Sequence, residues 1–151
     1  MIIKEIREFN QKLTQKGIRI IPVRISDKRM LVYVYRPEKL KEDFSDEKTQ
    51  IILKCKGYDC TNLSQCICRL IQKLQSDPDF PHEIGLFLGY PAEDVKGFIE
   101  NKAACSKCSG CWKVYGDEQA ARILFKKYKK CTEIYRRWKS GVAVEQLTIT
   151  I

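Results

Sequence analysis

Apolar residues recur at spacings of three and four along several stretches of the chain, a pattern typical of helices that pack by one face. The clearest stretch predicts a long helix that is capped by Asp117 and ends at Gly141. Shorter helices are predicted over residues 3–15, 37–44, 45–57, 62–75 and 91–102. The stripe of the long helix is predicted to be buried and consists of Ala121, Leu124, Tyr128, Cys131, Tyr135 and Trp138.

β-Branched and aromatic residues gather in other runs, which predict strands. Residues 18–25 and 30–36 predict a hairpin, in which Pro22 favours a sheet edge or a bulge because it cannot donate a ladder hydrogen bond. The apolar run EIGLFLG predicts a buried strand over residues 83–89, and WKVYG predicts a last one over 112–116. The tail, residues 142–151, is compatible with a short helix or a closing strand.

These elements together predict an α+β fold. Residues 1–151 are expected to form a single domain, in which about four mainly antiparallel strands make a sheet packed with helices. The composition agrees with a globular protein, because 44% of the 151 residues are hydrophobic and 10% are aromatic.

The sequence also bears on where the protein acts. No apolar run approaches the roughly 18 residues that a membrane-spanning helix needs. The N-terminal stretch MIIKEIREFNQKL lacks the continuous apolar segment of a signal peptide. We therefore expect a cytoplasmic protein without membrane association, whose thiols stay reduced.

Three of the eight cysteines, Cys105, Cys108 and Cys111, follow a C-x2-C-x2-C spacing within one predicted loop. Thiols so close together are typical ligands of zinc or an iron–sulfur cluster, or partners in thiol redox chemistry. A metal site needs a fourth ligand, for which Cys131 is the best candidate if the long helix packs against the loop. The alternatives are Cys55, Cys60, Cys66 and Cys68.

The same spacing also has a structural interpretation. A ferredoxin-type run continues to a fourth cysteine followed by proline, and a structural zinc site pairs two such knuckles, but the sequence shows neither clearly. Cys131 lies on the apolar stripe, where packing is an alternative to ligation. The first hypothesis is a cytoplasmic accessory protein that uses clustered cysteines for metal binding or thiol redox chemistry. Its alternative is a loop of packed thiols.

His82 and Glu83 form a second candidate site. His82 is the only histidine, and an imidazole can bind a metal or act as a general base. It can equally fix a turn by hydrogen bonding, and Glu83 is a candidate partner for it or for the basic helix. No nucleophile beside a base identifies an enzyme class, so the sequence leaves enzymatic activity open.

Positive charge is concentrated near the C-terminus. The formal net charge is +9, and residues 113–139 carry nine Lys and Arg against three acidic residues, a net of +6. The second hypothesis is therefore a non-enzymatic binding module that docks an acidic protein, such as a small electron carrier. Nucleic acid is a weaker alternative because no nucleic-acid-binding motif is present. The candidate contact residues are Arg122, Lys126, Lys127, Lys129, Lys130, Arg136 and Arg137.

Four segments together resemble a domain-of-unknown-function family found mainly in anaerobic Gram-positive bacteria of the clostridial type. They are MLVYVYRPEKL, FPHEIGLFLGYPAEDVKGFIENK, CSGCWKVYGD and FKKYKKCTEIY. The resemblance implies a cytoplasmic bacterial protein from an oxygen-poor lifestyle, and it implies no particular activity.

Two departures from that family pattern bear on the cysteines. Family members usually carry a further N-terminal segment with a Cys-Pro-Thr-like motif, which would precede Met1. Cys108 and Cys131 fall where the family pattern has cysteine, whereas Cys105 does not. The resemblance therefore weakens the claim that the triple-cysteine spacing is chemistry shared by the family.

Overall fold

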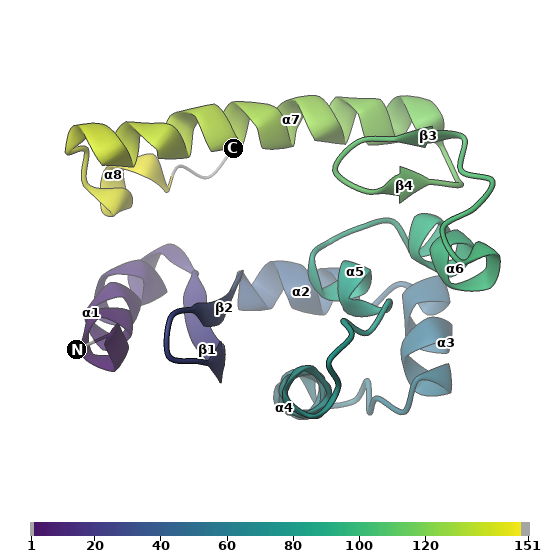
Figure 1. The fold of residues 1–151 in the computed structure, drawn as a ribbon, viewed down its shortest axis with the longest axis horizontal. Coiled ribbons are helices and arrows are strands. Elements are labelled where there is room, and N and C mark those ends of the chain that lie inside the picture. The colour runs from purple at the N-terminus through teal and green to yellow at the C-terminus, as the bar shows by residue number, and fades with distance from the viewer. Residues whose placement is uncertain (1, 149–151) are drawn as a thin grey trace.

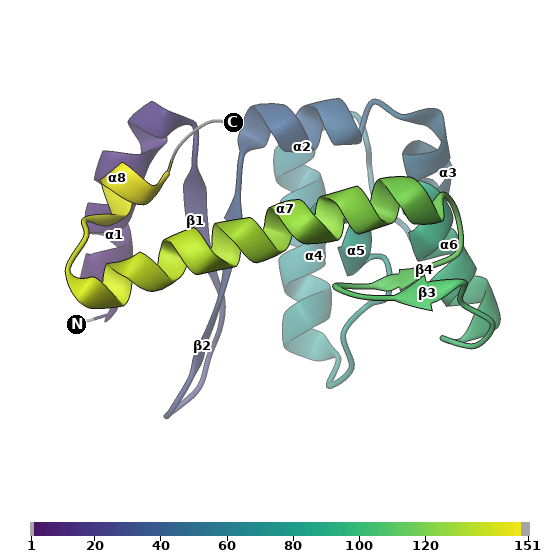
Figure 2. The same cartoon turned by 90° about the horizontal axis from the view of Figure 1, so that it is seen from above.

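A long C-terminal helix lies across a layer of shorter helices and strands (Figure 1). The computed structural model describes residues 2–148. Helix α7 (Glu118–Arg136) forms the upper layer and runs diagonally over the lower one (Figure 2). The lower layer contains α1 (Ile2–Leu13), α2 (Pro37–Asp43), α3 (Glu47–Cys55), α4 (Leu63–Ser76), α5 (Ile84–Phe87) and α6 (Ala92–Asn101). Shorter helical pieces are η1 (Thr14–Lys16), η2 (Arg137–Ser140) and α8 (Val144–Leu147).

The strands form two separate hairpins. β1 (Arg19–Ile25) pairs antiparallel with β2 (Met30–Tyr35), and the register shifts between Pro22 and Arg24, as a bulge at the proline predicts. β3 (Cys108–Ser109) pairs antiparallel with β4 (Lys113–Val114). The α+β class is confirmed, but within residues 2–148 the strands make two two-stranded sheets, not one four-stranded sheet.

The apolar run predicted as a buried strand is the short helix α5. Leu86 and Phe87 are buried in it, and an added Cβ on Gly85 would lie 2.8 Å from Val95 Cγ2. The prediction was wrong because a short apolar run buried on all sides looks the same as a strand or as a helix. The glycine instead allows α5 to approach α6 closely.

Helix boundaries follow the signals in the sequence. The Asn62 side chain accepts a hydrogen bond from Gln65 N at 3.2 Å, and Asp117 accepts one from Ala120 N at 3.0 Å. Of the undecided tail, Val144–Leu147 is helical, and residues 149–151 lie outside the described range.

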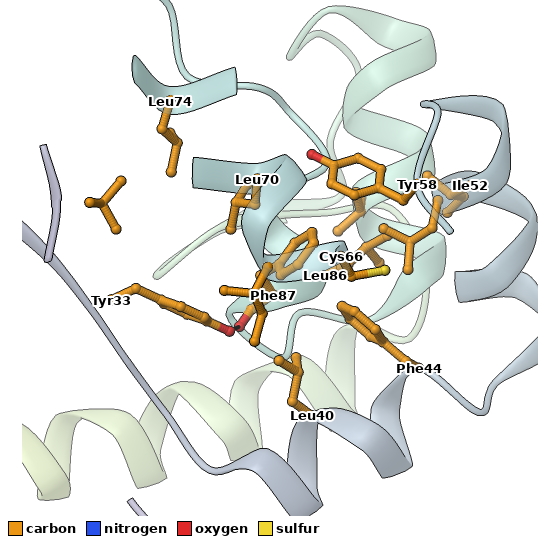
Figure 3. Close-up of a cluster of buried hydrophobic side chains, with 14 residues drawn as sticks. Tyr33, Leu40, Phe44, Ile52, Tyr58, Cys66, Leu70, Leu74, Leu86 and Phe87 are labelled. Carbon is orange, nitrogen blue, oxygen red and sulfur yellow. Dashed lines mark hydrogen bonds between the residues drawn. The ribbon is translucent and has the colours of Figure 1, made fainter. Parts of the chain in front are cut away.

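The main core lies between the β1–β2 hairpin and helices α2 to α6 (Figure 3). Phe87 is central to it, because its ring meets Phe44 edge to face at 5.0 Å and its carbonyl oxygen accepts a hydrogen bond from Tyr33 Oη at 2.5 Å. That bond ties the hairpin to α5. A smaller cluster of Trp112, Val114 and Ala121 lies under the first turns of α7.

The apolar stripe of α7 is less buried than its spacing predicts. Ala121 is the one buried residue of α7 among the described side chains, while Tyr135 and Trp138 are exposed. The spacing correctly predicts the helix, but the lower layer covers mainly its N-terminal half. No helix in residues 2–148 combines the length and the apolar character needed to cross a membrane.

Glu83 is a buried carboxylate at the start of α5, only 3% exposed. It accepts hydrogen bonds from Lys73 Nζ at 2.7 Å and Tyr58 Oη at 3.1 Å. Lys73 also donates to Lys56 O at 2.8 Å and lies 4.4 Å from the Tyr58 ring centroid. Burial alone would raise the pKa of Glu83, but its hydrogen bonds and the Lys73 charge lower that pKa below its ordinary value of 4.5.

Replacing Glu83 by glutamine should lower the free energy of unfolding by about 2 kcal/mol at neutral pH, because Lys73 loses a buried charged partner. Since the folded-state pKa is depressed, the contribution of Glu83 is present above pH 4.5 and is lost as the pH falls below it. Urea unfolding of wild type and E83Q across pH 7 to about 3 should therefore show the two stabilities converging. Glu42→Gln, which removes an exposed partner of Lys39, is the matched control. A difference between wild type and E83Q that does not vary with pH would contradict this account.

Candidate functional site

A buried carboxylate on α6 fixes the β3–β4 hairpin. Asp94 is 2% exposed, and its Oδ2 accepts a hydrogen bond from Trp112 Nε1 at 2.7 Å. Its Oδ1 accepts bonds from the backbone N–H groups of Tyr115 and Gly116 at 2.8 and 2.7 Å. Three donors satisfy the buried charge, and all three come from the hairpin or the turn after it. The cysteine-bearing segment is therefore held on α6 in one position.

Two glycines allow close packing around this carboxylate. A Cβ on Gly97 of α6 would lie 2.3 Å from Cγ of Tyr115, and one on Gly110 at the hairpin turn would lie 2.3 Å from Cε2 of Phe125 in α7. Neither position accommodates a larger residue without movement of an aromatic ring. The hairpin is thus clamped between α6 and α7.

The connection from α6 to the hairpin has an unusual backbone. Lys102, Ala103 and Cys105 all have positive φ angles, of 47°, 69° and 59°, although none is glycine. Lys113 Nζ donates a hydrogen bond to the Ala103 carbonyl oxygen at 2.6 Å, so the hairpin itself holds this strained connection.

The hairpin, α6 and the segment before α5 enclose a cavity of about 380 Å³. Its walls are largely aromatic: the Trp112 ring stacks on Tyr90 with centroids 4.5 Å apart, and His82 meets Phe98 edge to face at 5.1 Å. Its lining residues with polar side chains include His82, Cys111 and Lys113, and we call this cavity the aromatic pocket. An apolar cavity of this size with few polar groups is typical of small-ligand sites.

Comparison with known proteins places the chain in a family. A family model described as "Protein of unknown function (DUF3793)" matches residues 1–148. The chain belongs to the DUF3793 family. No curated protein and no solved structure matches it. The match spans both hairpins and all of α7, so the aromatic pocket lies within the part of the chain that defines its membership in DUF3793.

The pocket of this DUF3793 chain brings together two of the sequence-predicted site residues, His82 and Cys111, from segments distant in sequence. Both are exposed. Glu83 does not accompany them, because its carboxylate is bonded to Lys73 on the other side of the chain segment. The pairing of His82 with Glu83 that the sequence allowed is replaced by pairing of Glu83 with Lys73 and Tyr58.

The structure does not gather the four cysteines predicted as metal ligands. Cys108 is half-buried beside Trp112 and Val114. Cys105 is exposed in the connection between α6 and β3, where its φ angle is positive. Cys111 lines the aromatic pocket, and Cys131 is half-buried on α7. Among residues 2–148, no group of three or more His, Cys, Asp or Glu residues is placed to hold a metal ion.

Two other cysteines form a thiol pair that sequence reasoning missed. Cys66 Sγ donates to the Asp59 carbonyl oxygen at 2.9 Å, and the thiol of Cys60 lies beside it. Burial, then the neighbouring Cys60, raises the pKa of Cys66 to about 11, and burial raises that of Cys60 as well. Both thiols therefore stay protonated near neutral pH and act in packing.

Asp94, Trp112 and Tyr90 are the residues of the site that the sequence did not single out. Asp94 lies in the first turn of α6, where an acidic residue is explained by the helix dipole alone. The available signal was a tryptophan directly after the cysteines, because a buried indole N–H needs an acceptor.

Replacing Asp94 by alanine should lower the free energy of unfolding by about 3 kcal/mol, because the Trp112 N–H and two backbone N–H groups lose their acceptor. Chemical denaturation followed by tryptophan fluorescence measures the change. Glu93→Ala removes the neighbouring carboxylate, which forms an exposed ion pair with Lys48, and should cost about 1 kcal/mol or less. Equal losses in the two variants would show that Asp94 does not anchor the hairpin.

Proposed function

We propose that this protein binds a small, flat disulfide-containing molecule in the aromatic pocket and exchanges thiols with it through Cys111. The observation that carries the proposal is the shared pocket: an exposed thiol and the only imidazole of the chain line one cavity whose walls are Tyr90, Phe98 and Trp112. The rings offer flat apolar surfaces against which a planar ligand gains contact area.

The chemistry follows from the groups at the rim. The Cys111 thiolate attacks one sulfur of the bound disulfide, a new S–S bond joins that half to Cys111, and the old S–S bond breaks. The other half leaves as a thiolate, and His82 in its imidazolium form supplies the proton. Electrons balance without a further oxidant because the ligand disulfide is reduced as Cys111 is oxidised.

Other thiols of the chain are less suited to this step. Cys60 and Cys66 are held as thiols by their raised pKa values. Cys108 packs beneath α7 with the Trp112 cluster and does not line the pocket. Cys68 and Cys105 are exposed outside the aromatic pocket, so they serve as internal controls for simple accessibility.

The test uses dithiodipyridine, an uncharged flat aromatic disulfide. Cys111 should react about tenfold faster than Cys68 or Cys105, because the pocket holds the reagent beside its thiol. Release of thiopyridone gives the rate, and peptide mass spectrometry assigns the site.

Phe98→Ala, which opens one wall of the pocket, should slow the reaction at Cys111 and leave Cys105 unchanged. His82→Gln should slow the reaction at Cys111, because the imidazole no longer supplies a proton to the leaving thiolate, and should leave the rate at Cys105 unchanged. Equal rates at Cys111 and Cys105 in the folded wild type would overturn the proposal.

A second candidate function is docking of an acidic protein on the outer face of α7. Among the described cations of this helix, Arg122 is paired with Glu118 at 2.6 Å, and no ion pair occupies Lys126, Lys127 or Lys130. These three lysines surround the exposed Ile123 at spacings of three, four and seven residues, which lie on one helical face. Unpaired cations around an apolar side chain suit a partner with an acidic rim and an apolar centre.

Fluorescent poly-glutamate tests this surface. Binding should weaken steeply with salt, and the double variant K126E/K130E should weaken it about tenfold. The control is the double variant K4E/R7E on α1, which changes the net charge by the same amount as K126E/K130E but at exposed residues of another helix. If the α1 variant weakens binding equally, only net charge matters and α7 is not the docking face. Tighter binding of a short DNA duplex would favour nucleic acid instead.

A further inference from the structure

Three exposed apolar side chains border one cavity between α7 and the lower layer. Val34, Leu88 and Tyr135 are 54%, 44% and 47% exposed, and all three line a cavity of about 530 Å³. They come from β2, the segment after α5, and α7, so the apolar surface is assembled by the fold. Exposed apolar groups gathered around a hollow mark ligand or partner sites.

The walls of this cavity are rich in tyrosine. The rings of Tyr33 and Tyr35 are parallel, with centroids 4.9 Å apart and planes 6° apart. Tyr33 is fixed by its hydrogen bond to Phe87 O, visible beside Leu40 in Figure 3. Tyr128 and Tyr135 face the cavity from α7. We call it the tyrosine cavity, and none of its lining residues belongs to the aromatic pocket.

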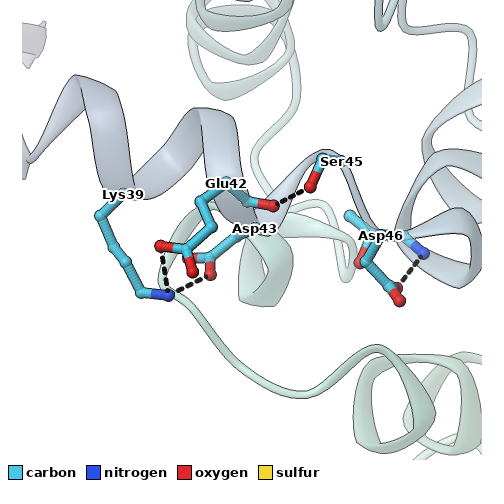
Figure 4. Close-up of polar contacts among 6 residues, drawn as sticks. Lys39, Glu42, Asp43, Ser45 and Asp46 are labelled. Atoms are coloured by element: carbon cyan, nitrogen blue, oxygen red, sulfur yellow. Dashed lines mark hydrogen bonds and ion pairs between the residues drawn. The ribbon is translucent and has the colours of Figure 1, made fainter.

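Charged groups also border the tyrosine cavity. Lys39 Nζ lies 2.9 Å from Asp43 and 3.2 Å from Glu42, so two carboxylates of α2 neutralise its charge (Figure 4). Arg36 donates from Nη1 to the Lys16 carbonyl oxygen at 2.6 Å, and no ion pair within residues 2–148 neutralises it. Arg36 therefore brings to the lining of the cavity a positive charge that has no ion-pair partner within residues 2–148.

We infer that the tyrosine cavity binds a flat aromatic molecule carrying one anionic group. Its volume suits a ligand of a few fused rings, its walls supply aromatic surfaces for stacking, and Arg36 supplies the charge that an anionic group needs. The inference is independent of Cys111 and of the outer face of α7, because neither contributes to this cavity.

Two fluorescent probes test the inference on the full chain. Anilinonaphthalene sulfonate has flat rings and one sulfonate, and phenylnaphthylamine has the same rings without it. Both should bind at one site, the sulfonate about tenfold more tightly. Arg36→Gln should remove that preference and leave binding of the neutral probe unchanged.

Variants in the walls separate stacking from charge. Tyr35→Leu should weaken the binding of both probes about tenfold, because their naphthalene rings lose an aromatic ring against which to stack. Tyr135→Ala, on the exposed part of α7, should weaken both without disturbing the core, and urea unfolding confirms that each variant is folded.

Two control variants test whether the probes bind at other sites. Phe98→Ala opens the aromatic pocket and Lys130→Gln removes a cation from the outer face of α7, and neither should alter binding of either probe. Loss of binding in F98A, or of the sulfonate preference in K130Q, would place the probes elsewhere and overturn the inference. Unchanged binding in R36Q, Y35L and Y135A would overturn it as well.

Discussion

The arrangement of the site depends on the hydrogen bonds that the buried carboxylate of Asp94 accepts from the β3–β4 segment. The β3–β4 hairpin has strands of two residues each, and so short a ladder is not stable by itself. Asp94 replaces the missing strand pairing with three hydrogen bonds to one buried anion. Because Trp112 directly follows Cys111, its bond to Asp94 fixes the orientation of the indole and the place of the cysteine turn together.

Trp112, which Asp94 holds in place, also contacts the upper layer. Its ring contacts Tyr90 from the lower layer, and Phe125 and Tyr128 from α7, with centroids 4.5, 4.5 and 5.9 Å away. The N-terminal half of α7 is therefore held on the hairpin, while Tyr135 beyond it stays exposed. Trp112 lines the aromatic pocket, and Tyr128, whose ring it contacts, lines the tyrosine cavity, so this contact between the layers borders both.

Local signals in the sequence predict much of the fold. The cap at Asp117, the irregularity at Pro22 and the helix over residues 62–75 each depend on neighbouring residues, and each is found in the structure. The structure differs from the predictions where contacts between residues distant in sequence determine the secondary structure. Residues 84–89 are all apolar and carry no period that separates a helix from a strand, and the close packing of Gly85 against Val95 of α6 accompanies the helix. The stripe of α7 predicts a helix but cannot predict how far the lower layer extends beneath it.

The site illustrates the same division. Spacing along the chain correctly places Cys105, Cys108 and Cys111 in one short segment, but proximity in sequence does not decide where side chains point. In the hairpin Cys108 belongs to a strand paired with Val114, whereas Cys111 lies in the turn. That difference sends one thiol beneath α7 and the other to the pocket that His82 also lines. Cys60 and Cys66 meet instead in the lower layer, where burial keeps them protonated. The proposed thiol exchange depends on this difference, because Cys111 is exposed and lines the aromatic pocket together with His82.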